Sequence, residues 1–321
     1  RPGDLETLFQ LIHLTMTAPR EDAEAFAVWQ EQWRTFLQNR ELSPSAALQD
    51  ALIESLYGDD VRSRVPTLEE IEAIDLARAF EIYAERFGDA GDFTFIFVGN
   101  FDVAELTELA QTYLGTLPAG ERVESWRDVQ PPLPQGVVQN DVFAGQEEQS
   151  VTQLVFTGEY DPEALSWMSL NGLETVLDSR LLRDLREARS GVYTSFVNVE
   201  ESDEPSPRYE VSIGFGSDPQ RAEELVGATF DILSDLRQNG PSEDEMTKVR
   251  EQARRTLEES LRQNGFWLDQ LEQVYYSASE QDPLAVLDYE EEIAAVTAEE
   301  IQTAAETLLT LDKYVRVTLF P

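Results

Sequence analysis

The chain has 321 residues, 41% of them hydrophobic, and 63 acidic residues against 24 basic ones give a formal net charge of −39. A chain this acidic repels phosphate backbones, which argues against nucleic-acid binding, and no apolar run reaches the roughly 20 residues of a membrane span. Cysteine is absent, which removes disulfides, thiol catalysis and thiolate metal sites.

The acidic residues are spread along helical segments and do not form a tail. This pattern predicts a solvated acidic surface on a folded protein. One interpretation is recruitment of basic peptides, and the other is adaptation to high salt, where screening removes self-repulsion. Lysine occurs only at Lys248 and Lys313, and this scarcity favours a surface of the halophilic kind.

Residues 1–120 are predicted to be mostly helical. The apolar periodicity and turn signals place helices at 4–17, 21–39, 44–57, 67–87 and about 102–114. The second helix is expected to turn its aromatic residues inward, namely Phe26, Trp29, Trp33 and Phe36. Thr67 and Glu70 form a predicted capping box at the start of the fourth helix.

Residues 92–100 are predicted to form a buried strand, because they combine aromatic and β-branched side chains in a short apolar run. A single buried strand cannot satisfy its own backbone groups. Its partner strands must therefore come from elsewhere. We expect residues 1–120 to be the end of an incomplete α+β domain, in a sequence that is truncated at its N-terminal side.

A proline-rich segment marks a change in the pattern. Pro131, Pro132 and Pro134 follow Pro118 and Gly120, and they predict a linker at residues 121–135. The sequence after the linker, residues 136–321, is predicted to be a complete domain.

The second domain is predicted to contain strands and helices in mixed order. Strands are expected at 137–144, 150–158, 191–199, 208–215 and 314–319, with a turn near residue 145 joining the first two. Helices are expected at 162–187, 218–238, 242–262, 264–278, 283–294 and 297–310. Strand pairs followed by helices indicate an α+β sandwich in which helices cover a mostly antiparallel sheet.

The sequence contains few residues that could bind a metal ion or a nucleotide. His13 is the only histidine, whereas zinc sites need two or more histidines or cysteines. Neither H-E-x-x-H nor its inverted form can occur, and there is no nucleophile elbow or phosphate-binding loop. We therefore predict no metal or cofactor site in this chain and an ordinary helical role for His13.

The segment from Leu181 to Ser195 is the most informative part of the sequence. A helix ends in arginines, Gly191 can close it in a left-handed conformation, and a strand follows. This arrangement can bring Arg186 and Tyr193 toward one space. An arginine can hold a peptide carbonyl or carboxylate, and a phenol can donate a hydrogen bond to a developing oxyanion. The alternative is a charged helix end beside a tyrosine packed on a sheet.

The same segment resembles a known family element. Residues 186–193, Arg-Glu-Ala-Arg-Ser-Gly-Val-Tyr, are similar to the R-E-x-x-x-G-x-Y element in the second half of the insulinase/pitrilysin-type metallopeptidases, which carry an inverted zinc motif. Residues 93–102 resemble the strand-to-helix element that closes a domain in this family. Residues 15–22, 113–118 and 240–245 resemble large bacterial members in which both halves lie in one chain. The resemblance runs from about residue 4 to the end.

The resemblance implies a fold and separate roles for the two halves of the parent protein. The expected fold consists of two metallopeptidase-like α/β sandwich domains, the first of them incomplete. This chain would be the C-terminal half of a zinc-dependent endopeptidase that cleaves peptides in a closed chamber. Zinc would be bound by an N-terminal half, in the same chain or in a partner subunit. Arg186 would hold the substrate backbone, Tyr193 would hydrogen-bond the scissile carbonyl, and the chain alone would be inactive.

Two other functions are compatible with parts of the sequence. A non-catalytic peptidase-like scaffold or assembly subunit would have the same fold, but it has no need of Arg186 and Tyr193. An acidic helical adaptor is disfavoured by the predicted strands after residue 136. The family resemblance also favours a bacterial protein with a periplasmic or secreted location over a cytoplasmic one.

Overall fold

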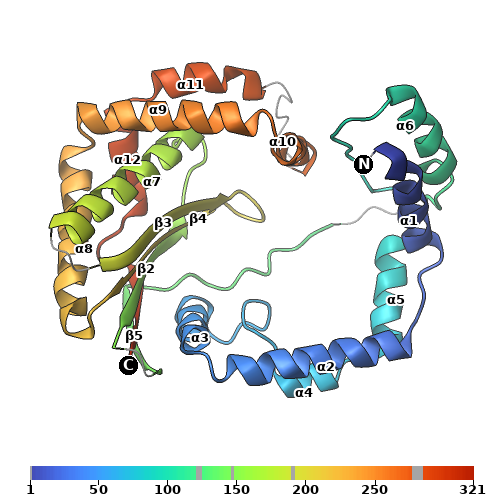
Figure 1. The fold of residues 1–321 in the computed structure, drawn as a ribbon, viewed down its shortest axis with the longest axis horizontal. Coiled ribbons are helices and arrows are strands. Elements are labelled where there is room, and N and C mark those ends of the chain that lie inside the picture. The colour runs from blue at the N-terminus through green and yellow to red at the C-terminus, as the bar shows by residue number, and fades with distance from the viewer. Residues whose placement is uncertain (1, 121–124, 146–147, 189–191, 277–284) are drawn as a thin grey trace. The chain divides into compact units, whose positions relative to one another are not determined.

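The chain folds into two compact units whose segments alternate along the sequence. The computed structural model describes residues 2–120, 125–145, 148–188, 192–276 and 285–321 (Figure 1). The helical unit comprises Arg1–Gln38, Pro66–Arg127 and Leu261–Pro283, and the sheet unit comprises Asn39–Val65, Asp128–Ser260 and Leu284–Pro321. The α+β class expected from the sequence is confirmed, while the domain boundary at residues 121–135 stays a prediction.

The helical unit is built from short and medium-length helices. They are η1 (Pro2–Asp4), α1 (Leu5–Thr17), most of α2 (Ala23–Arg40), α4 (Leu68–Glu72), α5 (Leu76–Phe87), α6 (Val103–Leu109), η2 (Ala110–Leu114) and α10 (Asn264–Tyr276). The capping box of Thr67 and Glu70 is confirmed. The single helix predicted at 67–87 is wrong, because the side chain of Asp75 accepts hydrogen bonds from the amides of Ala77 and Arg78 and begins a new helix.

Helix α1 is held by one buried aromatic ring and one histidine. Phe9 is fully buried and stacks on Phe97, with ring centroids 5.1 Å apart. The Nδ1 atom of His13 donates a hydrogen bond of 2.8 Å to the backbone carbonyl of Tyr113. This contact gives the half-buried imidazole a structural partner.

Helix α2 does not bury its aromatic stripe. Phe26, Trp29, Trp33 and Phe36 contact one another in succession, with centroid distances of 5.7, 6.1 and 5.4 Å. No residue of α2 is buried. The predicted inward face is therefore wrong, because the rings at helical spacing pack along the helix on one another.

Residues 93–98 do not form the predicted strand. No strand is assigned to them, and the side chains are exposed from Phe93 to Thr94 and half-buried from Phe95 to Val98. A strand exists only when a neighbouring strand takes up its backbone hydrogen bonds. Within the described residues no such neighbour lies beside this segment. Asp102 caps the next helix by accepting hydrogen bonds from the amides of Ala104 and Glu105.

The sheet unit contains five strands in the order β1-β5-β2-β4-β3. They are β1 (Val137–Phe143), β2 (Ser150–Glu159), β3 (Val192–Ser202), β4 (Arg208–Ser217) and β5 (Tyr314–Phe320). β1 pairs parallel with β5 and the other neighbours pair antiparallel, so the sheet is mixed. The first two strands, predicted to follow one another through a turn, are not neighbours, because β5 lies between them.

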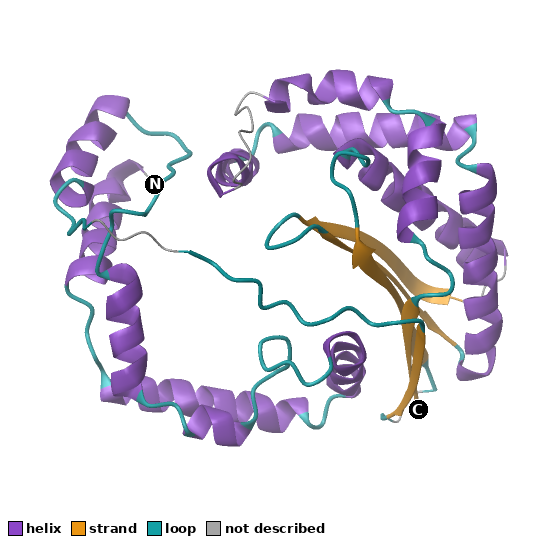
Figure 2. Ribbon diagram, turned by 180° about the vertical axis from the view of Figure 1, so that it is seen from behind, coloured by secondary structure: helices purple, strands orange, loops and turns teal. Residues whose placement is uncertain are grey.

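Helices cover the sheet on both faces (Figures 1 and 2). α7 (Trp167–Leu181), α8 (Ala222–Asn239) and α12 (Ala298–Leu308) form the main core with one face, and α9 (Glu243–Ser260) and α11 (Tyr289–Ala295) lie outside them. α3 (Pro44–Tyr57) packs on β5 and β1 from the other face. The shorter turns are η3 (Leu182–Ala188), η4 (Pro219–Arg221) and η5 (Ala285–Asp288).

The two faces of strand β4 differ in side-chain size. Val211, Ile213 and Phe215 are at most 2% exposed and enter the helix-covered core. On the opposite face, Gly214 lies beneath the ring of Phe196 in β3. A Cβ atom at position 214 would lie 2.1 Å from Cε1 and 2.4 Å from Cζ of that ring. The position of the Phe196 ring over β4 therefore depends on a glycine at position 214.

We predict that Gly214→Ala lowers the free energy of unfolding by about 1–3 kcal/mol, because the added methyl group displaces the ring of Phe196. In a Phe196→Ala background the same change should cost less, since the obstacle is gone. Urea unfolding measures both. Gly227→Ala in α8 is the control: no atom lies within 4 Å of its added Cβ, so it should stabilise by up to about 1 kcal/mol. Equal costs in both backgrounds would contradict the prediction.

A buried ion-pair network joins helices α7, α8 and α9. The guanidinium of Arg180 in α7 donates to both carboxylate oxygens of Glu245 in α9, at 2.8 and 2.9 Å. It also donates to Asp235 of α8 and to the carbonyl of Gly240. Ser242 donates its amide and hydroxyl to Glu245. Burial opposes ionisation of Glu245, but the hydrogen bonds from Arg180 and Ser242 outweigh it and lower its pKa to about 2.

We predict that Arg180→Met lowers the free energy of unfolding by about 3–5 kcal/mol at neutral pH, because it leaves Glu245 buried without its cation. Since the pKa of Glu245 is lower in the folded state, the stabilisation is complete above its ordinary value of 4.5 and is lost as the pH falls toward 2. The difference between wild type and variant should shrink over that interval. Urea unfolding at several pH values measures it, and a difference that is constant with pH would contradict the assignment.

Candidate functional site

Arg186 lies in η3, the wide helical turn that continues α7 from Leu182 to Ala188. Leu181 and Leu185 are buried in the core and fix the turn, whereas Arg186 is exposed. The predicted helix end is therefore present at this position. Gly191, expected to close the helix, lies outside the described residues.

Tyr193 lies at the start of β3, where the strand departs from regular pairing. The register with β4 shifts between Val192 and Thr194, so Tyr193 is an additional residue in the strand. Val192 is buried, and the Tyr193 side chain is 57% exposed. A bulge of this kind turns a side chain away from the regular alternation, which suits a residue that meets a ligand. The pairing of Tyr193 with Arg186 in one site stays a prediction.

The neighbouring arginines are engaged in other contacts. Arg180 is buried in the ion pair with Glu245, and Arg183 donates to the carboxylate of Asp184 at 2.7 Å. Neither was predicted as a site residue. Arg180 and Arg183 are thus engaged in ion pairs, whereas Arg186 is exposed and faces solvent.

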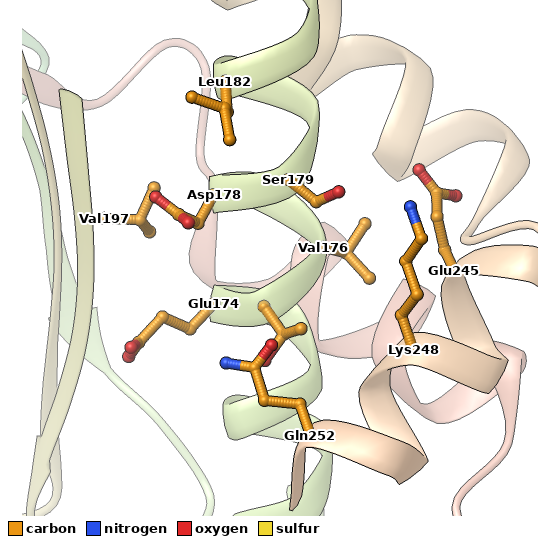
Figure 3. A pocket seen from close by; sticks show the side chains of 10 residues that line it. Glu174, Val176, Asp178, Ser179, Leu182, Val197, Glu245, Lys248 and Gln252 are labelled. Carbon is orange, nitrogen blue, oxygen red and sulfur yellow. The ribbon is translucent and has the colours of Figure 1, made fainter. Parts of the chain in front are cut away.

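A pocket of about 280 Å³ lies beside the same elements, between α7, β3 and α9. Figure 3 shows Glu174 and Asp178 of α7 directed toward β3, while Val176 and Ser179 are directed toward α9. The lining residues are Glu174, Thr175, Val176, Asp178, Ser179, Leu182, Val197, Glu245, Lys248 and Gln252. The wall on the β3 side is therefore acidic.

The carboxylate of Glu174 is bound to the edge of the sheet. It accepts a hydrogen bond of 3.1 Å from the backbone amide of Val199 in β3. Burial raises the pKa of Glu174, the amide of Val199 partly offsets this, and the charge of Asp178 raises it further. The sequence analysis did not single out these two carboxylates. Their i, i+4 spacing is the only signal for them, and that spacing is common on exposed helices.

The described residues do not fit a zinc ion. No group of three or more histidine, cysteine, aspartate or glutamate side chains among them could hold a metal. The one histidine is bonded to a backbone carbonyl in the helical unit. Within the described part of the chain, no helix has the length and apolar character that crossing a membrane requires.

Comparison with known proteins gives a family match over more than half of the chain. Residues 73–253 match the family described as the peptidase M16 inactive domain. This range contains both Arg186 and Tyr193, as well as β1 to β4 and α7.

Two relatives are similar over most of this chain. A zinc protease PQQL-like protein of Arabidopsis thaliana is 24% identical over 292 residues, which cover 86% of this chain and 30% of that protein. A probable zinc protease PqqL of Escherichia coli is 25% identical over 319 residues, which cover 96% of this chain and 33% of that protein. This chain thus spans about a third of the length of these relatives.

The crystal structure of the periplasmic protease PqqL from Escherichia coli has the same fold. Its TM-score to this chain is 0.78 at 21% identity, and the match covers all of this chain and 35% of that one. At this identity the structural likeness concerns the fold alone.

Proposed function

Because the chain belongs to the peptidase M16 family through its inactive domain, we propose that it is the substrate-binding half of a zinc-dependent endopeptidase. The observation that carries the proposal is the exposure of Arg186 and Tyr193 at the two ends of one α7–β3 connection. Both residues lie within the family match, and the neighbouring Arg180 and Arg183 are held in ion pairs.

In the proposed function, each of the two residues has a separate chemical role. Arg186 holds the backbone of a peptide near the bond to be cleaved, through charge-assisted hydrogen bonds to carbonyl oxygens. Tyr193 donates a hydrogen bond from its phenol O–H to the scissile carbonyl oxygen, where negative charge develops. The first interaction acts on the bound peptide, and the second is strongest in the transition state.

In the same proposal, the metal comes from another part of the protein. An N-terminal half, in the same chain or in a partner subunit, binds zinc, activates water and closes with this half into a chamber. The names of the relatives and their threefold greater length support a larger parent protein. The periplasmic location of the Escherichia coli protease supports a periplasmic or secreted protein here. Peptides are the proposed substrates.

We predict that Tyr193→Phe in the protein joined to its zinc-binding half lowers kcat by about 10–1000-fold, because an oxyanion donor is lost. Arg186→Lys should instead raise KM by about tenfold, because the planar two-donor contact is lost while the charge remains. Steady-state peptide cleavage separates the two constants.

Two variants serve as matched controls for this experiment. Tyr275→Phe changes a tyrosine that is 63% exposed on α10, and Arg183→Lys changes an arginine three residues from Arg186. Both should leave kcat and KM near the wild-type values. Unchanged turnover in Tyr193→Phe would remove the phenol from the site and favour a non-catalytic scaffold.

We also predict that the 321-residue chain binds no stoichiometric zinc and cleaves no peptide by itself. One imidazole and no thiolate cannot supply the usual ligands of a hydrolytic zinc site. Isothermal titration with zinc measures this, with the joined protein as the positive control. One tightly bound zinc ion per chain would refute the assignment of the metal to the other half.

A further inference from the structure

Strand β3 is an open edge of the sheet. It has 11 residues, from Val192 to Ser202, and within the described residues only β4 pairs with it. A long edge strand presents a row of backbone N–H and C=O groups that another strand can bind.

The outward-facing backbone groups of β3 can be identified from one contact. The amide of Val199 donates to Glu174 of α7 and so points away from β4. Backbone direction in an antiparallel pair alternates with a period of two, and the register is regular from Thr194 to Ser202. Ser195 and Val197 therefore also turn their amides and carbonyls outward. Among the described residues, neither of these two amides donates a hydrogen bond to a loop or a side chain.

A strand placed along this edge would send every second side chain toward α7. The side chains of Val197 and Val199 already face that way, because they pack against the helix-covered core. The pocket of about 280 Å³ opens there, and its size suits one long side chain better than a whole ligand. Val197 and Leu182 form apolar walls, and Glu174 and Asp178 supply negative charge on the β3 side (Figure 3). Lys248 and Glu245 of α9, one cation and one anion, line the opposite side.

We propose that the open edge of β3 binds an extended peptide segment whose lysine or arginine side chain enters this pocket and pairs with Glu174 and Asp178. The methylene groups of such a side chain would lie on Val197 and Leu182, with the cation between the carboxylates. Backbone hydrogen bonds at Ser195 and Val197 would hold the segment. This inference rests on the proposed function in taking the segment to be part of a substrate.

Two further observations favour a basic side chain. Burial raises the pKa of Glu174 and the charge of Asp178 raises it further, so a cation between the two carboxylates would offset both the lost hydration and their repulsion. The formal net charge of −39 also attracts basic peptides over long distances at low salt. The competing role for Glu174 is to block the edge against self-association. That role predicts no preference for a basic ligand.

The test measures binding of short capped peptides to the 321-residue chain by fluorescence anisotropy. The peptides alternate threonine and valine around one central residue, which is arginine or its uncharged analogue citrulline. The arginine peptide should bind about tenfold more tightly than the citrulline peptide. Glu174→Gln and Asp178→Asn should each weaken the arginine peptide by about tenfold and leave the citrulline peptide unchanged. The glutamine at 174 keeps an oxygen that can accept from Val199.

Glu251→Gln is the matched control, because it removes the same charge from an exposed position on α9 outside the pocket. It should leave the affinity for both peptides unchanged. Hydrogen exchange at the amides of Ser195 and Val197 should slow when the arginine peptide is bound, which a purely electrostatic association would not cause.

Any of three results would overturn the inference: equal affinity for both peptides or no binding of either, an equal loss in Glu251→Gln, or unchanged exchange at Ser195 and Val197. These experiments need neither zinc nor turnover. A failure here leaves the effect of Tyr193→Phe on kcat as an independent test of the proposed function. Peptide binding together with unchanged kcat in Tyr193→Phe would support the peptide site at β3 and contradict the proposed role of Tyr193.

Discussion

The structure depends on one constraint: each strand must find a neighbour for its backbone hydrogen bonds. β5, the last strand of the chain, meets this need in the middle of the sheet, where it pairs parallel with β1 and antiparallel with β2. Without it, β1 would have no partner among the described strands. The same constraint bears on two other places. β3 pairs on one side only, so its outer backbone groups have no neighbouring strand among the described residues. Residues 93–98 have no neighbouring strand on either side, and no strand is assigned to them.

The position of β3 at the edge of the sheet, with α7 beside it, also determines where the residues of the candidate site lie. α7 covers the sheet beside β3 and continues into η3, so Glu174 and Asp178 of this helix are directed toward the edge strand. Glu174 bonds the edge directly, and Arg186 lies near the opposite end of this helical stretch. Arg180 faces away from the edge into the helix layer, where it binds Glu245. One helix therefore combines a structural face with a face that can meet a ligand.

Charge has different consequences in the interior and on the surface. The Arg180–Glu245 pair is less than a tenth exposed and is stabilised by further hydrogen bonds from Ser242. Exposed pairs such as Arg78–Glu81 contribute little, because water and salt screen them. The large excess of acidic residues is thus mainly a property of the surface, and it acts on the approach of charged partners more than on the fold.

Much of the local structure followed from the sequence. Capping residues and apolar periodicity located most helices, because these signals act over a few residues. The element at residues 186–193, together with several other segments, resembles the family to which the chain belongs. Local signals failed where a second element decides the outcome: among the described residues the segment predicted as a strand at 92–100 has no neighbouring strand, and the aromatic rings of α2 pack on one another.

By itself, the sequence determined that one histidine and no cysteine cannot form a usual zinc site, since ligand chemistry is a matter of residue type. Only the tertiary structure decided that β5 separates β1 from β2, that β3 lies at the edge, and that Glu174 reaches the amide of Val199. The physical reason is that these contacts join residues far apart in the chain. Their hydrogen bonds depend on the direction of each backbone group after the sheet has formed, and no local pattern encodes that direction.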